Sequence, residues 1–282
     1  MEHLFSPGTI GSMEMKNRFF RAATGDAHAV EGHYTDEDFR WYETMADSGV
    51  GAVITGLAYV ADYPMRDGPG MLGIYDDSFI HEYRCLAEMM HEKDTRLIPQ
   101  LVHCGSNMYR RREQAIGPSA VENPMSGVTP VEMSEDEIGR IKEAFIRAAV
   151  RAKEAGCDGV ELHGAHGYLL HEFLSTYYNK RADSYGGSLE NRARLLLEIC
   201  AGIRQETGEQ FPILVKINCN DRVPGITHED YLKTGELLQE AGASAIEVSG
   251  AWKNNQSWHP YFLSETKELA EQLQIPVILT GG

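Results

Sequence analysis

The sequence lacks the cysteine patterns of a disulfide framework or a metal site. It contains five cysteines in 282 residues, an odd number, and no two of them are spaced as C-x-x-C. Disulfide-rich secreted domains and zinc or iron–sulfur sites have regular cysteine spacings that are absent here. The five thiols therefore fit buried or incidental positions in a protein of a reducing compartment.

Basic residues are scarce as well. The chain has 26 Lys and Arg against 42 Asp and Glu, which gives a formal net charge of -16. Nucleic acids and anionic membrane surfaces need a basic face, so we expect neither as a partner. An anionic ligand is still compatible with this charge where backbone amides and a few cations gather locally.

Long apolar runs are also missing. No apolar stretch of the sequence is long enough to span a bilayer. The N-terminal MEHLFSPGTIG has no basic segment followed by an apolar one, which a secretory signal would need. We therefore expect a cytoplasmic protein with no membrane partner. Its hydrophobic content of 42% is enough to bury a large core.

The sequence does contain a regular alternation of short β-rich apolar runs and longer amphipathic segments. Nearly continuous apolar runs are typical of strands buried on both faces. Seven strands are predicted, beginning at Phe19, Val50, Arg96, Gly159, Ile213, Ala245 and Pro276. Helical patterns lie between them, near residues 36–48, 78–93, 135–155, 188–207, 228–241 and 263–273.

This alternation favours a TIM (β/α)8-type barrel over a doubly wound sheet. A doubly wound sheet should show a G-x-G-x-x-G turn after its first strand, and none is present. We expect a single domain over residues 1–282. The chain has only about seven βα units, because it stops in or just after the strand PVILTGG. The predicted fold is therefore an incomplete barrel, C-terminally truncated, with its last strand and helices missing.

Polar residues and glycines gather where the predicted strands end. In a barrel, reactive groups lie at these C-terminal ends and in the loops that follow them. Loops after late strands often bind phosphate through backbone amides. One site at this end would collect Ala23, Thr24, Gly56, Gln100, His103, His163, His166, Lys216, Gly281 and Gly282.

The fourth predicted strand leads into HGAHGYLLHEF, with two histidines and a tyrosine. His163 and His166 could donate hydrogen bonds to one carbonyl oxygen and stabilise the charge that develops there. Tyr168 could deliver a proton to a carbon atom. The histidines could instead be metal ligands, although no third ligand is evident, or structural residues. Tyr168 alone could equally serve packing.

Lys216 and Gln100 occupy strand positions that favour a ligand. Lys216 lies in the apolar run ILVKIN, where a lysine needs a charge partner or a ligand. It could stabilise an anionic cofactor, form a salt bridge with Glu161 or Glu247, or be the Schiff-base lysine of a lyase or aldolase barrel. Gln100 carries a donor and an acceptor that suit the edge of a heterocycle, or ordinary loop hydrogen bonds.

Together these motifs resemble the old yellow enzyme family of FMN-dependent oxidoreductases, close to its NADH:flavin oxidoreductase and 2,4-dienoyl-CoA reductase branch. The similarity runs from about Leu4 to Gly282. LFSPGTIGSMEMKNRFFRAATGD is similar to the family's opening, and QLVHCG to its third-strand motif. HGAHGYLLHEFLS followed by NKRADSYGGSLENRAR is similar to its long signature around the fourth strand.

The resemblance implies an enzyme that reduces the C=C bond of α,β-unsaturated carbonyl compounds, with NADH or NADPH as the electron donor. The backbone at Ala23 and Thr24 would lie against the flavin of FMN, with Gly56 nearby. Gln100 would hydrogen-bond the ring, and Lys216 would stabilise its reduced, anionic form.

The resemblance also implies roles on the substrate side. His163 and His166 would bind the substrate's carbonyl oxygen, and Tyr168 would give the proton to the α-carbon. The FMN phosphate would be held after strands seven and eight, and Gly281 and Gly282 are the part of that site found here. The alternative is a truncated barrel that holds no FMN and is inactive. The substrate, the choice between NADH and NADPH, and the oligomeric state, a homo-oligomer included, are left open.

Overall fold

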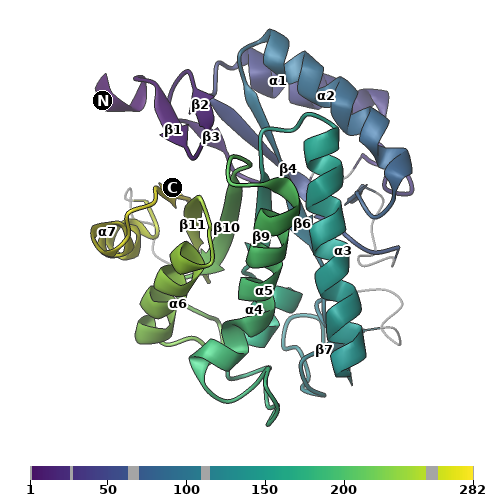
Figure 1. Ribbon diagram of the computed structural model, residues 1–282, viewed down its shortest axis with the longest axis vertical. Helices are drawn as coiled ribbons and strands as arrows, with labels where there is room; N and C mark the ends of the chain where they lie inside the picture. Colours follow the sequence, from purple (N-terminus) through teal and green to yellow (C-terminus); the bar gives the residue numbers. More distant parts are fainter. Residues whose placement is uncertain (1, 26–27, 63–69, 109–114, 252–259, 282) are drawn as a thin grey trace.

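The central sheet is an incomplete parallel barrel. The computed structural model describes residues 2–25, 28–62, 70–108, 115–251 and 260–281. Within them seven parallel strands follow one another in the order β12–β11–β10–β9–β6–β4–β3, and β3 and β12 are its two edges (Figure 1). The strands are β3 (Phe20–Arg21), β4 (Ala52–Tyr59), β6 (Arg96–Val102), β9 (Val160–Gly164), β10 (Ile213–Asn218), β11 (Ala245–Ser249) and β12 (Val277–Leu279). The predicted fold class and all seven predicted strands are confirmed.

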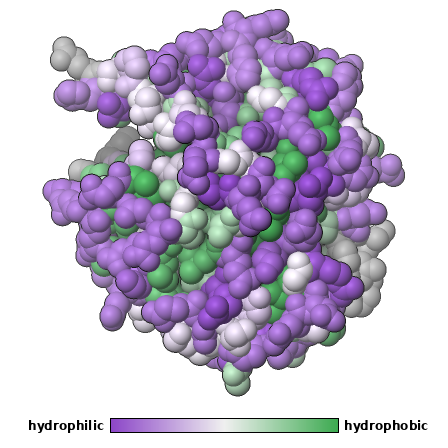
Figure 2. Space-filling model, in the orientation of Figure 1, coloured by the Kyte–Doolittle hydropathy of each residue, from purple (hydrophilic) through white to green (hydrophobic). Residues whose placement is uncertain are grey.

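Six helices cover the outer face of this sheet, as the periodicity predicts (Figure 1). Thr35, Ser134 and Thr227 each form a capping box at a helix start. A side-chain cap of this kind stabilises a helix by about 1 kcal/mol. The helices are α1 (Asp36–Asp47), α2 (Ile80–Glu92), α3 (Glu135–Glu154), α5 (Leu189–Thr207), α6 (His228–Glu240) and α7 (Leu263–Gln272). The face seen in Figure 2 is mostly hydrophilic, with hydrophobic side chains in patches between the helices.

Several short elements are additional to the predicted ones. A hairpin of β1 (Gly8–Ile10) and β2 (Met13–Met15) precedes the barrel. A short helix, α4, follows β9. The bounds of the remaining elements are η1 (Glu2–Leu4), β5 (Leu72–Gly73), η2 (Asp77–Phe79), β7 (Ile116–Gly117), β8 (Val131–Glu132) and α4 (Leu169–Leu174).

The hairpin closes the inside of the barrel at one end. Successive side chains of a strand point to opposite faces, so Val53 and Leu97 pack in the large outer core with the helices. The alternate residues Ile54 and Ile98 lie in a separate inner cluster. That cluster, the barrel floor, consists of Ile10, Met13, Met15, Ala52, Ile54, Ile98, Leu214 and Ala245. The floor marks the position along each strand after which the inward-facing residues are polar.

Two residues further along the strands, the inward-facing side chains become polar. Ile98, Leu214 and Ala245 of the floor are followed at this spacing by Gln100, Lys216 and Glu247. Glu161 of β9 is paired in register with Gln100 of β6. We call Gln100, Glu161, Lys216 and Glu247 the polar layer. All four are buried, with relative exposures between 0% and 3%.

A buried carboxyl group fastens the long segment after β6 to α4. Both the N–H and the hydroxyl of Ser106 donate to Oε1 of Glu172, and Asn123 Nδ2 donates to the Ser106 hydroxyl over 3.0 Å. A side chain at Gly105 would collide with the Glu172 carboxyl group, which explains the glycine there. Burial raises the pKa of Glu172 to about 8, although the Ser106 hydrogen bonds act in the opposite direction.

Glu172 therefore predicts a pH dependence of stability. The folded chain keeps this carboxyl protonated up to pH about 8, whereas the unfolded chain ionises it above pH ~4.3. Stability should thus fall as the pH rises between these values, by at most about 1.4 kcal/mol per pH unit. Glu172→Gln should remove this slope, as measured by urea unfolding at several pH values. Ser106→Ala, which keeps the carboxyl group, should retain it. Equal slopes in wild type and Glu172→Gln would contradict the assignment.

Candidate active site

A cavity of about 160 Å³ opens above the polar layer, at the C-terminal ends of the strands. It is lined by Ala23, Thr24, Gly25, Leu57, Gln100, His163, His166, Tyr168 and Lys216. Seven of these are residues singled out from the sequence, and they come from β6, β9, β10 and the segments after β3 and β9. We call this the inner cavity.

Of the four other predicted residues, three do not line this cavity and one is not described. His103 is buried, and its Nδ1 accepts from the Gly105 N–H over 3.2 Å. Gly56 sits where the β4–β6 register shifts, between Ile54 and Leu57. Its N–H donates to the Tyr42 hydroxyl over 2.9 Å, and its neighbour Leu57 lines the inner cavity instead. Gly281 lines a second cavity. Gly282 lies outside the described residues.

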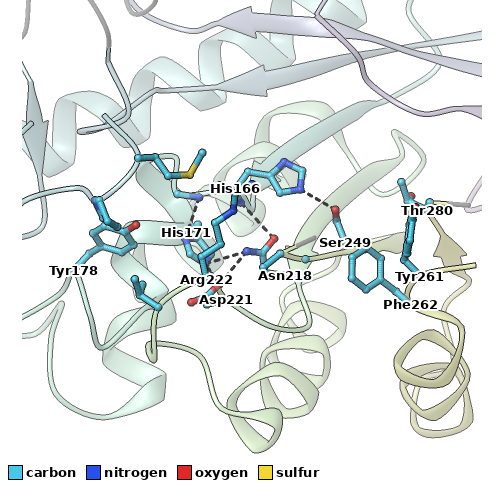
Figure 3. Close-up of a pocket in the computed structure, with 17 residues that line it drawn as sticks. His166, His171, Tyr178, Asn218, Asp221, Arg222, Ser249, Tyr261, Phe262 and Thr280 are labelled. Atoms are coloured by element: carbon cyan, nitrogen blue, oxygen red, sulfur yellow. Dashed lines mark hydrogen bonds and ion pairs between the residues drawn. The ribbon is translucent and has the colours of Figure 1, made fainter. Parts of the chain in front are cut away.

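The second cavity, of about 330 Å³, meets the inner one at His166 and is called the outer cavity here. Figure 3 shows Tyr178 on one side of it and Tyr261 and Phe262 on the other. Tyr261 and Phe262 belong to the aromatic stretch AWKNNQSWHPYF, which the sequence places near the rim of the pocket. The lining residues that were not predicted include Tyr178, Asn218, Asp221, Arg222, Ser249 and Thr280. Asn218 and Ser249 are the last residues of predicted strands, so the strand-end rule could have found them.

An unusual backbone turn places His166 between the two cavities. His166 has φ 61°, in the left-handed region that costs a non-glycine residue about 1 kcal/mol or more. Its N–H donates to Asn218 Oδ1 over 3.3 Å, and its Nε2 lies 2.7 Å from the Ser249 hydroxyl (Figure 3). Strained backbone of this kind persists where surrounding contacts fix it, which is common at functional sites.

The two histidines and the tyrosine form one aromatic group. The ring of His163 lies 4.7 Å from that of Tyr168 and 5.0 Å from that of His166, edge-on in both cases. The N–H of Ala165 donates to Nδ1 of His163 over 3.3 Å. The neutral His163 ring therefore carries its proton on Nε2.

Both imidazoles are neutral at physiological pH. Burial, together with the neighbouring His166 ring and the charge of Lys216, lowers the pKa of His163 well below its usual value. The protein around the His166 ring and the charge of Lys216 also lower the pKa of His166. His166 is an exposed residue by its surface area, so solvent makes its decrease smaller than that of His163. The pair can donate N–H hydrogen bonds without carrying positive charge.

Lys216 takes part in the salt bridges that the sequence allowed. Its Nζ lies 3.1 Å from Glu247 Oε1 and 3.9 Å from Glu161 Oε2. Burial acts to lower the pKa of Lys216, but the two carboxyl groups outweigh it and raise the pKa. A protonated amine is not a nucleophile, so this geometry disfavours the Schiff-base interpretation.

Gln100 has one end of its amide paired and the other available. Its Nε2 donates to Glu161 Oε2 over 2.5 Å. Its buried Oε1 has no hydrogen-bond partner in the part of the chain that the structure describes. An unpaired acceptor beside a cavity indicates a ligand that carries a donor.

The described residues contain neither a cluster of metal ligands nor a membrane-spanning helix. Within the described ranges, no three His, Cys, Asp or Glu side chains lie close enough together to hold a metal ion. The metal interpretation of His163 and His166 is therefore unsupported. No helix in those same ranges is both long and apolar enough to cross a membrane.

The comparison of the whole sequence with known families decides the lineage. Residues 3–282 match the sequence model of the NADH:flavin oxidoreductase / NADH oxidase family. The chain belongs to this family. A metal reductase of Desulforamulus reducens is 34% identical over 259 residues, which cover 91% of this chain and 38% of that protein. An NADH oxidase of Thermoanaerobacter brockii is 34% identical over an alignment of 296 positions, which covers 99% of this chain and 45% of that protein. The chain thus spans less than half the length of these two relatives.

Solved structures of the family have the same fold. A 2-naphthoyl-CoA reductase in complex with 2-naphthoyl-CoA superposes with a TM-score of 0.90 at 28% identity, over 98% of this chain and 46% of that one. Old yellow enzyme from Pichia sp. AKU4542 gives 0.83 at 26%, over 99% and 76%. An old yellow enzyme homologue from Zymomonas mobilis gives 0.86 at 23%, over 99% and 82%, a likeness of fold. The resemblance to old yellow enzymes is confirmed.

The His166 turn predicts that Asn218 stabilises the site. Asn218 accepts from the His166 N–H and donates from Nδ2 to Asp221 Oδ1 over 2.9 Å. Asn218→Ala should lower the free energy of unfolding by about 1–3 kcal/mol, because it leaves buried polar groups unpaired. Ser249→Ala, which removes one hydroxyl from the His166 ring, should cost about 1 kcal/mol or less. Urea unfolding of both variants checks this, and equal losses would argue against a special role for Asn218.

Proposed function

We propose that this chain is the catalytic barrel of an FMN-dependent oxidoreductase. It reduces the C=C bond of α,β-unsaturated carbonyl compounds and takes its electrons from NADH or NADPH. The observation that carries this proposal is the composition of the inner cavity. Two neutral imidazoles and a phenol face it together with a cation and a glutamine whose amide oxygen is unpaired.

The inner cavity suits the pyrimidine edge of a flavin. Oε1 of Gln100 would accept from a ring N–H, since this oxygen is buried without a partner among the described residues. Lys216 would compensate negative charge at the ring edge. The backbone at Ala23 and Thr24 would form a wall against the ring. FMN, when bound, would supply the hydride that the reaction needs.

A glycine-rich strand end would hold the phosphate group. Gly281 follows β12 with φ 97°, a conformation that disfavours other residues. Its amide would be available at the position where barrels bind phosphate, whereas the contribution expected of Gly282 concerns a residue outside the described ranges. Gly56 would support the ring indirectly, because it shapes the β4 bulge beside Leu57.

The chain's own residues would polarise the substrate and give it a proton. The N–H groups of His163 and His166 would donate to the carbonyl oxygen, which draws electrons from the conjugated C=C bond. Neutral imidazoles are poor acids for this purpose, so the proton for the α-carbon would come from the Tyr168 hydroxyl. Tyr168 lies at the edge of the His163 ring, and therefore on the same side of the cavity.

The outer cavity would take the body of the substrate on the side of His166 and Tyr178, and its end at Gly281 would remain for the phosphate group of FMN. Tyr178, Tyr261 and Phe262 give it aromatic walls, and Arg222 adds a positive charge. A planar conjugated acyl compound fits such walls. The 2-naphthoyl-CoA in the related reductase supports this class of substrate.

The first test is a flavin titration of the purified chain. We expect FMN to bind stoichiometrically, with a shifted visible spectrum and quenched fluorescence, because the ring-binding groups are already positioned. A folded chain that binds no FMN would contradict the proposal. It would support the alternative of a barrel that does not hold FMN and is inactive.

Two substitutions separate substrate polarisation from proton delivery. His166→Ala should lower kcat/KM by about 100-fold, since it removes one donor to the carbonyl oxygen. Tyr168→Phe should leave flavin reduction by NAD(P)H unchanged and slow product formation by up to about 100-fold, with solvent replacing part of the proton supply. Stopped-flow kinetics with a simple enone measures both half-reactions. Unchanged turnover in His166→Ala would overturn its assigned role.

A further inference from the structure

The reaction as proposed leaves the two carboxyl groups of the polar layer without a role. We propose that Glu161 and Glu247 share a single proton, carry one negative charge between them, and so set the net charge that Lys216 presents to the cofactor. Both act through Lys216 and are positioning residues. The effect on the cofactor depends on the proposed function, whereas the shared proton does not.

Burial makes two separate charges on this pair costly. Glu161 and Glu247 are both 0% exposed, and Lys216 of the intervening strand β10 lies against each of them. Two carboxylates and one ammonium would leave one uncompensated negative charge on groups that are buried from solvent. Proteins avoid such a charge by protonating one of the groups.

The groups that the neighbouring strands place around the pair compensate one negative charge, which is the charge of one carboxylate and one carboxylic acid. β6 contributes the neutral Gln100, β9 the neutral His163, and β12 is followed by the hydroxyl of Thr280. Besides Lys216, the charge of Arg21 of β3 acts on this layer, but Arg21 donates to the carbonyl of Ala22 and the hydroxyl of Thr24. Lys216 is thus the one cation with an ion pair to these carboxyl groups among the contacts described for the layer.

The contacts of the two carboxyl groups also show where the proton rests. Oε1 of Glu247 receives the Lys216 ammonium at 3.1 Å and the Thr280 hydroxyl, which stabilise an anion. Glu161 receives the neutral Gln100 amide, and the ammonium is farther away at 3.9 Å. The second oxygen of each group, Oε1 of Glu161 and Oε2 of Glu247, has no other partner within the described ranges. One proton between these two oxygens satisfies both.

The pKa directions agree with this arrangement. Burial and the neighbouring Glu247 carboxylate raise the pKa of Glu161 well above its usual value. Burial alone would raise the pKa of Glu247 too, but Lys216 and the hydrogen bonds to its carboxylate lower it. The proton therefore belongs on Glu161 while Glu247 is ionised.

A shared proton determines the net charge of the polar layer in the wild type, in the two single variants and in the double variant. Glu161→Gln replaces a neutral acid by a neutral amide and leaves the charge of the layer unchanged. In Glu247→Gln, the remaining Glu161 ionises and again compensates Lys216. The double variant has no carboxylate left, so the ammonium acts on the flavin uncompensated. If instead both carboxyl groups were ionised, each single substitution would already remove one negative charge.

The first measurement is the midpoint potential of bound FMN at pH 7 in wild type, Glu161→Gln, Glu247→Gln and the double variant. We expect both single variants to stay close to wild type. The double variant should favour the reduced flavin by about tenfold or more, equivalent to about 30 mV for a two-electron couple. A rise in each single variant as large as the further rise in the double variant would overturn the shared proton.

The second measurement needs no cofactor and separates this inference from the proposed function. In the FMN-free chain, the shared proton is lost on unfolding, so the unfolding constant of the wild type should rise about tenfold per pH unit above pH ~5 from this pair alone. Both single variants should lack that component. Glu172 contributes equally to all four proteins and cancels in the comparison. An identical slope in wild type and both single variants would refute the shared proton, whether or not FMN binds.

Discussion

The structure depends on burying ionisable groups inside the barrel. The polar layer of Gln100, Glu161, Lys216 and Glu247 lies directly above an apolar floor and directly below the inner cavity. Each member is tolerated only because another member or a ligand satisfies it. If Glu161 and Glu247 share a proton, Gln100 Oε1 is the acceptor of this layer left without a partner among the described residues, and the proposed cofactor would supply a donor to it. Charge balance within the layer and ligand binding in the inner cavity thus meet the same requirement, that buried polar and charged groups have partners.

The upper half of the site is positioned by backbone rather than by charge. The left-handed turn at His166 lets the chain leave β9 and begin α4 within a few residues, so that His163, His166 and Tyr168 face one space. Asn218 fixes this turn from the end of β10. The end of β10 thus holds the group of His163, His166 and Tyr168 in place, and the loops determine the shape of the outer cavity.

Much of this could be predicted from the sequence, for identifiable reasons. The seven strands are continuous apolar runs, and residues at their ends, such as Gln100 and Lys216, meet in the inner cavity as the strand-end rule requires. The hairpin β1–β2 and the strands β7 and β8 have two or three residues each, too few to show a period. Gly56 follows a strand run in the sequence, but a register shift in β4 turns its neighbour Leu57 toward the cavity. The shared environment of Glu161 and Glu247 arises from three-dimensional pairing, which no local pattern records.

The barrel floor also governs the order in which the chain can fold. Ile10, Met13 and Met15 are synthesised about 200 residues before their partners Leu214 and Ala245 in the floor. The Ser12 hydroxyl likewise bonds the carbonyl of Gln210, 198 residues away. Contacts this distant along the chain close late, because the entropy of a long loop must be overcome before they form. The hairpin β1–β2 is therefore among the last elements of the described barrel to reach its place, and the polar layer stays open to water until β11 has joined the sheet.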